Sequence, residues 1–267
     1  MKLYSAVERI YNDLESLGYS REDALDPRVL AGLDQLHYHG TEAVDAAAQA
    51  LGIVEEFQVL DIGSGFGGPA RWLASQHGAT VKAVELQGDM NGTAADLTRR
   101  CGLSDKVMHI QGDILKTPLE SEGYDAAVSW LALYHIPNRS VLFPNVFNAL
   151  KSGGGLYIED LYQISTPTPV EQQHLDGMLA AGTMHTRDVY LHELTSAGFT
   201  DIDFHDKTED WVTFTTDRVA AFKANKDAYI AHQSVETYAE LEEFYDVVAD
   251  VLAGGNVGGV RLTAWKR

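Results

Sequence analysis

The stretch that decides the fold is Val59-Leu60-Asp61-Ile62-Gly63-Ser64-Gly65-Phe66-Gly67-Gly68. Its first half is apolar and ends in glycines, which is typical of a buried parallel strand. The glycines let the backbone turn tightly and approach a ligand closely, and the helix predicted at 69–78 offers unpaired N–H groups at its first turn. The sequence therefore predicts a strand, a ligand-binding loop and a helix in succession.

The same alternation of strands and helices continues along the chain. Apolar runs with helical segments between them predict four further strands, at 80–86, 106–113, 124–133 and 155–162. A sixth strand is expected at 200–208, a long helical stretch at 214–252 and a final strand near the end of the chain. This order is typical of an α/β fold with a Rossmann-like parallel sheet and helices on both faces.

Two segments lie outside this pattern. Residues 1–50 have helical spacing, with Thr41 predicted to cap a helix that stops at Gly52, and we expect them to form an N-terminal helical lid. Residues 51–267 form the α/β domain, in which a Pro-rich start and a helical stretch at about 162–190 indicate a cap inserted after the fifth strand.

The composition excludes several classes of partner. The net charge is −19, from 39 acidic and 20 basic side chains, so the surface repels nucleic acid and anionic lipid. Apolar runs are too short to span a membrane, and charges interrupt the first 19 residues, so we expect no signal peptide and a cytoplasmic location. Cys101 is the single cysteine and no histidine pair has metal-ligand spacing, so we predict no metal site. The oligomeric state is not predicted.

Three acids stand at the ends of successive predicted strands. Asp61 precedes the first glycine, Glu85 ends the second strand and Asp113 ends the third. Ligands of open parallel sheets bind at these carboxyl ends. Asp61 can meet an ammonium group, Glu85 can accept both hydroxyls of a ribose and Asp113 can accept from an adenine amino group. Taken singly, Asp61 could cap the loop, Glu85 could be solvated at a helix start and Asp113 could be a helix N-cap.

Gly63, Gly65 and Gly68 also match the G-x-G-x-x-G pattern of dinucleotide-binding loops. A nicotinamide-dependent oxidoreductase is therefore an alternative, although no Y-x-x-x-K follows the fourth predicted strand. A non-catalytic scaffold is a further alternative, which the intact loop and acids disfavour.

The segments DIGSGFGG (61–68), VEL (84–86), QGDIL (111–115) and LKSGGGLYI (150–158) together resemble the class I S-adenosylmethionine-dependent methyltransferases. The SAGF segment at 196–199 also resembles the family's lead-in to its sixth strand. The resemblance implies S-adenosyl-L-methionine as cofactor. It implies cofactor contacts at Asp61, Gly63, Ser64, Gly65, Gly67, Glu85, Leu86, Gln87, Asp113, Ile114 and Trp130.

Other segments are similar to the glycine, sarcosine and dimethylglycine N-methyltransferases and to phosphoethanolamine methyltransferases. They are GFGGPARWLA (65–74), VYLHELTSAGFTDIDFHDKTEDW (189–211) and AGGNVGG (253–259). In those families the fourth strand ends in a segment resembling S-x-D-x-x-x-H. Here Ser129 and His135 match, but Leu131 stands at the acid position. The resemblance implies methylation of a small polar metabolite and a role in osmolyte biosynthesis.

His135 is the predicted catalytic base, because a histidine ordinarily titrates near neutral pH and an amine acceptor must lose a proton. It could instead be a histidine that only caps the loop after its strand. We also predict that Tyr11 and His37 line the lid beside the transferred methyl group, although Tyr11 could be a packing residue and His37 a surface residue. The predicted reaction is methyl transfer to an amine of the glycine, sarcosine or dimethylglycine type. The alternative acceptor is a small sulfur-containing acid.

Overall fold

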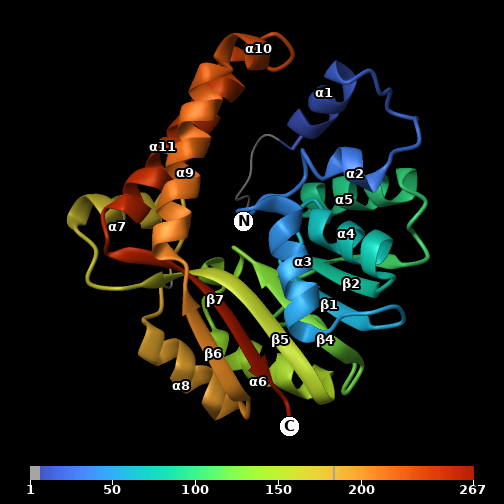
Figure 1. Cartoon of the computed structure of the whole chain (residues 1–267), viewed down its shortest axis with the longest axis vertical. Helices are drawn as coiled ribbons and strands as arrows, with labels where there is room; N and C mark the ends of the chain where they lie inside the picture. The colour runs from blue at the N-terminus through green and yellow to red at the C-terminus, as the bar shows by residue number, and fades with distance from the viewer. Residues whose placement is uncertain (1–6, 183) are drawn as a thin grey trace.

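Within residues 7–182 and 184–267, which the computed structural model describes, seven strands form one sheet (Figure 1). Their order is β3-β2-β1-β4-β5-β7-β6, with β1 to β5 parallel and β7 antiparallel to both of its neighbours. The strands are β1 (Gln58–Ile62), β2 (Thr80–Glu85), β3 (Val107–Gln111), β4 (Tyr124–Trp130), β5 (Leu150–Gln163), β6 (Thr200–Asp206) and β7 (Val257–Trp265). The predicted Rossmann-like sheet is confirmed.

Helices cover both faces of this sheet. They are α1 (Arg9–Ser16), α2 (Pro27–Leu30), α3 (Gly40–Leu51), α4 (Gly68–His77), α5 (Gly88–Arg100), the 3-10 turn η1 (Leu133–His135), α6 (Arg139–Ala149), α7 (Pro169–Asp176), α8 (Arg187–Ala197), α9 (Thr208–Ala224), α10 (Lys226–Ile230) and α11 (Val235–Ala253). None of the helices in the described part of the chain is long and apolar enough to cross a membrane.

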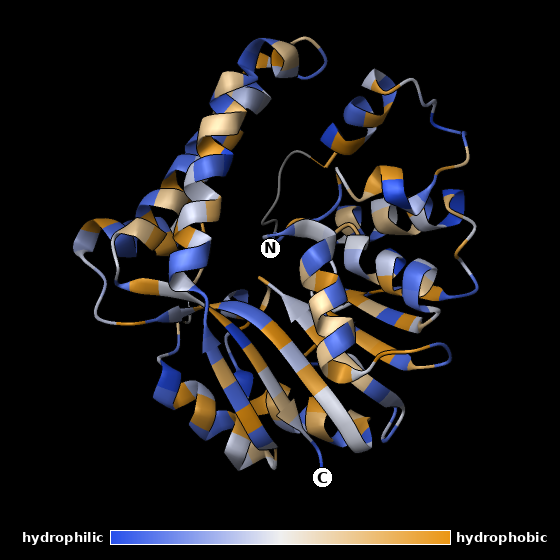
Figure 2. Ribbon diagram, viewed as in Figure 1, coloured by the Kyte–Doolittle hydropathy of each residue, from blue (hydrophilic) through white to orange (hydrophobic). Residues whose placement is uncertain are grey.

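Adjacent residues of β1 show how the two layers form. Successive strand residues point to opposite faces, so Val59 and Leu60 are buried on different sides. Val59 belongs to a cluster that contains Val44 of α3 and Leu73 of α4, whereas Leu60 belongs to a cluster that contains Phe143 of α6. Figure 2 shows the hydrophobic residues gathered along the strands between these layers. The central strand β1 is therefore buried on both faces, as its apolar sequence predicts, whereas the edge strand β6 is largely exposed.

The predicted lid of residues 1–50 divides into two parts, and its residues 1–6 lie outside the described residues. Helix α3 packs against the sheet with α4 and so belongs to the helix layer. Its N-cap is His39, in the left-handed region with φ 58°, so the prediction of Thr41 as cap is wrong. Gly52 ends the helix as predicted, with φ 65°. Only α1, α2 and the segment up to His39 lie over the edge of the sheet.

The cap is larger than the sequence predicts. Helix α7 lies within the predicted segment 162–190, but helices α9 to α11 belong to the same assembly. One cluster joins Leu175 of α7, Trp211 of α9 and Leu252 of α11. The long helix expected at 214–252 is in fact a hairpin, in which α9 and α11 lie side by side and α10 forms the tip (Figure 1). This hairpin faces the N-terminal segment across the carboxyl ends of the strands.

Candidate active site

The loop between β1 and α4 depends on glycines in the left-handed region. Gly63 has φ 73° and Gly65 has φ 54°, where other residues are strained. A Cβ atom on Gly63 would lie 2.4 Å from the Cβ of Ala132, so a larger residue would displace the segment after β4. A Cβ on Gly65 would reach 3.4 Å from Leu36 Cδ1. The loop therefore packs tightly against the segment after β4, and it also borders a cavity.

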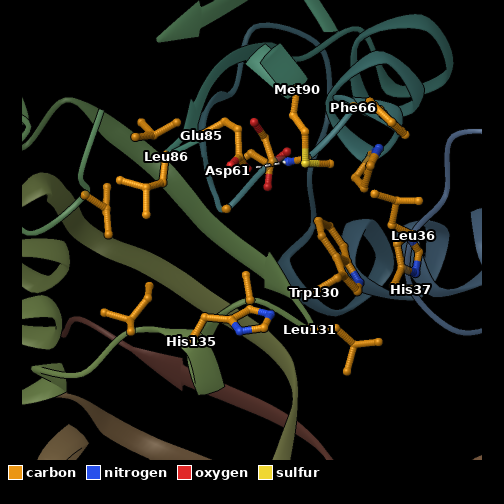
Figure 3. A pocket seen from close by; sticks show the side chains of 18 of the residues that line it. Leu36, His37, Asp61, Phe66, Glu85, Leu86, Met90, Trp130, Leu131 and His135 are labelled. Atoms are coloured by element: carbon orange, nitrogen blue, oxygen red, sulfur yellow. Dashed lines mark hydrogen bonds between the residues drawn. The ribbon is translucent and has the colours of Figure 1, made fainter. Parts of the chain in front are cut away.

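A cavity of about 320 Å³, which we call the inner pocket, opens beside this loop (Figure 3). It lies at the carboxyl ends of β1, β2 and β4, the usual ligand position in an open parallel sheet. Its walls are mainly apolar, with Asp61 and Glu85 along one side and His135 along another. Its size is at the lower end of the range of about 300–1,000 Å³ for small-molecule sites.

Asp61 is buried, and its Oδ2 has no hydrogen-bond partner in the described structure. Burial, together with the negative charge of Glu85, raises the pKa of Asp61 to about 7. A cation bound beside such a carboxyl group stabilises its charged form. Asp61 is therefore suited to a bound ammonium group.

The carboxylate of Glu85 is held in place by the backbone. The Gly65 N–H donates to Glu85 Oε2 at 2.9 Å, and the Gln87 N–H donates to Glu85 Oε1 at 2.7 Å. Burial raises the pKa of Glu85, and these backbone N–H groups oppose the rise. Each oxygen keeps a second lone pair for a ligand hydroxyl. The observed pair of buried carboxylates thus fits an amino-acid group and a ribose.

Asp113 lies at the far side of the inner pocket. Its Oδ1 accepts from the Leu115 N–H at 3.0 Å, and its Oδ2 lies 3.0 Å from Lys116 Nζ. It therefore stabilises the turn after β3, where no helix begins, so it is not a helix N-cap, and it also lines the pocket. These two roles are compatible, because a carboxylate has about four acceptor positions.

A second cavity of about 760 Å³, the outer chamber, adjoins the inner pocket. The N-terminal segment, the loop after α7 and the α9–α11 hairpin enclose it. The two cavities have common lining residues, namely Leu36, His37, Phe66, Met90 and His135. A molecule in the outer chamber can therefore approach a ligand in the inner pocket directly.

His135 lies at this junction, at the end of η1. Its Nδ1 lies 3.1 Å from the carbonyl oxygen of Ala180, and because a carbonyl only accepts, Nδ1 carries the proton. Its Nε2 is buried and has no partner among the described residues. Burial lowers the pKa of His135 to about 4, so the ring is neutral at pH 7 and Nε2 presents a free lone pair.

Comparison with known proteins decides the family. A model described as a methyltransferase domain matches residues 60–158, from β1 to β5, the part of the chain that carries the glycine loop and the three acids. This part of the chain is a class I S-adenosylmethionine-dependent methyltransferase domain. The predicted family and its cofactor, S-adenosyl-L-methionine, are confirmed. The orphaned carboxylate of Asp61 and the oriented carboxylate of Glu85 fit this cofactor.

Curated relatives are distant. Methyltransferase GfsG of Streptomyces halstedii is 27% identical over 67% of this chain and 66% of its own length. Sarcosine/dimethylglycine N-methyltransferase of Aphanothece halophytica is 27% identical over 64% of this chain and 61% of its own length. This methyltransferase thus matches less than two thirds of either relative's length.

A solved structure gives the same fold. The Haemonchus contortus phosphoethanolamine N-methyltransferase 2, in complex with phosphomonomethylethanolamine and S-adenosylhomocysteine, superposes with a TM-score of 0.83 and 20% identity. The match covers 98% of this chain and 57% of that one. The methyltransferase fold therefore includes the N-terminal segment and the helical cap as well as the sheet.

Nine of the predicted cofactor residues of this methyltransferase line the inner pocket, and two do not. The nine are Asp61, Gly63, Ser64, Gly65, Glu85, Leu86, Asp113, Ile114 and Trp130. Gly67 is the left-handed N-cap of α4, and a Cβ there would lie 2.5 Å from His109 Cε1, so its role is in packing. Gln87 points its amide to Asp89 and contributes only its backbone N–H to Glu85.

Two of the three predicted catalytic residues have other surroundings than expected. Tyr11 lies outside both cavities, with its hydroxyl 3.2 Å from Asp96 Oδ2, so the expectation that it closes over the methyl group is not met. His37 lines both cavities, but its ring stacks on Trp130 and both nitrogens are engaged, Nδ1 with the Tyr38 carbonyl and Nε2 with Gln35. His37 therefore forms a wall, and His135 alone offers a free nitrogen.

No acid replaces the one missing at Leu131. Leu131 lines the inner pocket with φ 48°, a strained backbone for leucine. Glu159 is buried against Arg261 at 2.8 Å, and Asp160 is buried against Arg139 at 3.1 Å. Neither acid lines a cavity. The side of the pocket nearest the end of β4 is therefore apolar.

Sequence reasoning missed most of the outer chamber. Its walls include Phe214 and Arg218 of α9 and Phe244 and Tyr245 of α11, which lie far along the chain from the cofactor loop. Met90 of α5 was also missed, although it borders both cavities. The sequence signal for this chamber was the recurrence of aromatic residues along the predicted helix at 214–252. Helical spacing alone, however, does not distinguish a residue that packs in the core from one that lines a pocket.

Proposed function

We propose that this protein transfers a methyl group from S-adenosylmethionine to a small molecule bound in the outer chamber. The observation that carries the proposal is the continuity of the two cavities, with the free Nε2 of His135 where they meet. One cavity has the carboxylates of a cofactor site, and the other has the volume of a separate substrate site.

Residues of the inner pocket would hold the cofactor. Asp61 would pair with its ammonium group, Glu85 would accept from its ribose hydroxyls and Asp113 would accept from its adenine amino group. When bound, S-adenosylmethionine supplies an electrophilic methyl group on a sulfonium. The stacked rings of His37 and Trp130, with centroids 5.5 Å apart, form a rigid wall that excludes water from this region.

His135 would act as the proton acceptor for an acceptor molecule that carries an N–H, O–H or S–H group. Its Nε2 has the lone pair that this role needs, and the bond from Nδ1 to Ala180 fixes both tautomer and orientation. The positive charge that develops on the ring would be shared with that carbonyl oxygen. With a pKa of about 4, the resting ring is a weaker base than the near-neutral histidine expected from the sequence, so proton transfer would depend on the charge that develops in the reacting complex.

The N-terminal segment would keep solvent out of the outer chamber. Its α1 helix is joined to the tip of the helical hairpin by several contacts, which include Asp13 to His232 at 3.0 Å and Asn12 to Gln233 at 3.0 Å. His39 is joined to Asp210 of α9 at 3.0 Å. These contacts close the chamber between elements distant in sequence, which favours alignment of two substrates.

The identity of the acceptor remains a prediction. A small amine of the glycine, sarcosine or dimethylglycine type is supported by the name of the Aphanothece relative, and a small sulfur-containing acid is the alternative. The apolar Leu131 disfavours a cationic amine, because no carboxylate stabilises charge beside it. A role in osmolyte biosynthesis and a cytoplasmic location are likewise predictions. The nicotinamide alternative is not retained, since the family's cofactor is S-adenosylmethionine.

The direct test is to incubate the protein with isotopically labelled S-adenosylmethionine and panels of amines, thiols, thioethers and carboxylic acids, and to identify methylated products by mass spectrometry. We expect turnover with at least one panel, and phosphoethanolamine to be a poor acceptor. Calorimetry with S-adenosylhomocysteine should show binding in the same preparation. Absence of cofactor binding would refute the proposal, since the inner pocket would then have another ligand.

A further inference from the structure

Arg218 projects from α9 into the outer chamber without an acidic partner. It lines the chamber, and its Nε is buried with no hydrogen-bond acceptor in the described structure. No ion pair of Arg218 with a carboxylate occurs between described residues, and residues 1–6 contain no acid. The chain has 39 acidic and 20 basic side chains, yet no carboxylate of the described residues pairs with this inward-facing arginine.

Aromatic rings hold this guanidinium in a fixed position. Its Cζ lies 4.5 Å from the ring centroid of Tyr245, 5.2 Å from that of Tyr38 and 5.7 Å from that of Phe214. Cation–π contacts of this kind position the charge but accept none of its N–H bonds. A side-chain hydrogen bond joins Arg218 to Tyr38, whereas its buried Nε has no acceptor and remains available for a carboxylate.

The other walls of the chamber are mainly apolar. Phe222 and Phe244 come from the hairpin, Leu33 from the N-terminal segment and Met178 from the loop after α7. Together with a volume of about 760 Å³, these walls fit an acceptor with a hydrophobic body larger than that of glycine.

The acidic side chains that line the chamber do not neutralise its positive charge, so an anionic ligand can bind there. Asp13 is already bound to His232 and Gln233, at 3.0 Å and 2.8 Å. Glu240 and Glu243 are exposed at the rim, where water screens them. Arg9 lines the chamber opposite the hairpin and adds a second positive charge.

We propose that the methyl acceptor is a carboxylic acid whose aromatic or aliphatic body also carries an N–H, O–H or S–H group. The carboxylate binds Arg218, the body lies along the aromatic wall of the hairpin, and the nitrogen, oxygen or sulfur atom takes the methyl group while its proton passes to Nε2 of His135. The inference rests on the proposed function, because it names the class of molecule in the acceptor site. A cationic amine without a carboxylate is disfavoured by Arg218 itself.

The test uses three probes with the same indole body and different charge, namely indole-3-acetate, indole-3-ethanol and tryptamine. Each is titrated by calorimetry into the protein saturated with S-adenosylhomocysteine. We expect indole-3-acetate to bind about tenfold or more tighter than indole-3-ethanol, and tryptamine to bind most weakly. Tighter binding of tryptamine, or no binding of any probe, would overturn the proposal.

The variant Arg218→Met tests the residue, since methionine keeps the apolar stem and removes the charge. We expect it to lose the preference for indole-3-acetate while its affinity for indole-3-ethanol stays unchanged. Arg187→Met is the matched control, because Arg187 stacks on Phe204 at 5.5 Å outside both cavities. Should Arg218→Met fold poorly by circular dichroism, Arg218→Lys replaces it and should keep part of the preference. An unchanged preference in the folded Arg218→Met variant, or its loss in the lysine variant, would sink the proposal.

The cofactor titration separates the two levels of inference. Failure to bind S-adenosylhomocysteine would overturn the proposed function. Binding of S-adenosylhomocysteine without any preference for the carboxylate probe would overturn only the assignment of the acceptor class.

Discussion

Arg71 Nη2 lies 2.8 Å from Asp34 Oδ2, and both side chains are buried. Arg71 belongs to α4, directly after the cofactor loop, whereas Asp34 belongs to the N-terminal segment. Arg71 also donates to the carbonyl of Phe66 at 2.5 Å and to Thr98 at 3.0 Å. One guanidinium thus fixes the covering segment, the loop and α5 in a single arrangement.

Removing one partner of this pair should strongly destabilise the protein. We expect Asp34→Ala to lower the free energy of unfolding by about 3–5 kcal/mol, because the buried Arg71 is then uncompensated. Urea unfolding followed by circular dichroism measures the change. The exposed pair of Lys223 and Asp246 supplies the control, Asp246→Ala, which should have a small effect. Equal losses of unfolding free energy in Asp34→Ala and Asp246→Ala would show that the buried pair of Arg71 and Asp34 has no special structural importance.

The contribution of Asp61 to the stability of the cofactor-free protein should fall as the pH rises from about 4 to about 7, whereas buried His37, His109 and His135, with pKa values of about 4, contribute in the opposite direction. The pKa of Asp61 is about 7 in the folded chain against an ordinary 3.8, so over this range the folded state holds a proton that the unfolded state has lost. Unfolding free energies at about pH 5 and about pH 8 test this contribution, because the change in stability with rising pH should be more positive in Asp61→Asn than in the wild type. Asp125→Asn, which lies away from the pocket, should match the wild type. An equal slope in both variants would assign the effect to other groups.

Binding of S-adenosylhomocysteine should release a proton below about pH 7, because the ligand's ammonium favours the charged form of Asp61. Calorimetry in two buffers with different ionisation enthalpies measures this release. We expect it to vanish in Asp61→Asn, together with a loss of affinity. Proton release of wild-type size in that variant would contradict the contact.

Substitutions at the second carboxylate and in the glycine loop of the cofactor site should also weaken binding. We expect Glu85→Ala to lose about 1–3 kcal/mol of binding free energy through unpaired ribose hydroxyls. Gly65→Val should bind more weakly still, since φ 54° strains valine and its side chain approaches Leu36 and Met90. The control is Gly92→Ala, at an open helical position of α5. Wild-type affinity in both pocket variants would remove the basis of the cofactor site.

His135→Asn should lower kcat by about 100-fold or more with an acceptor that must lose a proton, while the affinity for S-adenosylhomocysteine changes little. Asparagine keeps a polar group but offers no basic nitrogen. His77→Asn, on the surface at the end of α4, is the control. A kcat within about twofold of wild type would show that His135 only shapes the site.

The sheet and most of the cofactor site could be predicted because their signals are local. Asp61, Glu85 and Asp113 each end a short apolar strand, and parallel order brings strand ends to one edge whatever the exact packing. The same local signal misassigned Gly67 and Gln87, because both belong to motifs whose other residues line the pocket. In the structure Gly67 is the N-cap of α4, and the Gln87 side chain bonds Asp89 at the start of α5.

Only the tertiary structure determines which residues line the outer chamber. Arg218 and Phe244 look like ordinary residues of long helices, and only the folding of α9 back along α11 turns them toward His135. Tyr11 shows the converse, since its sequence position suggested the site but packing turned its hydroxyl to Asp96. Strand and loop chemistry depends on neighbours a few residues away, so the sequence by itself determined the family, the sheet and the cofactor. The shape and charge of the acceptor site depend on contacts between residues some 200 positions apart, from Asp13 to His232, which only the folded chain brings together.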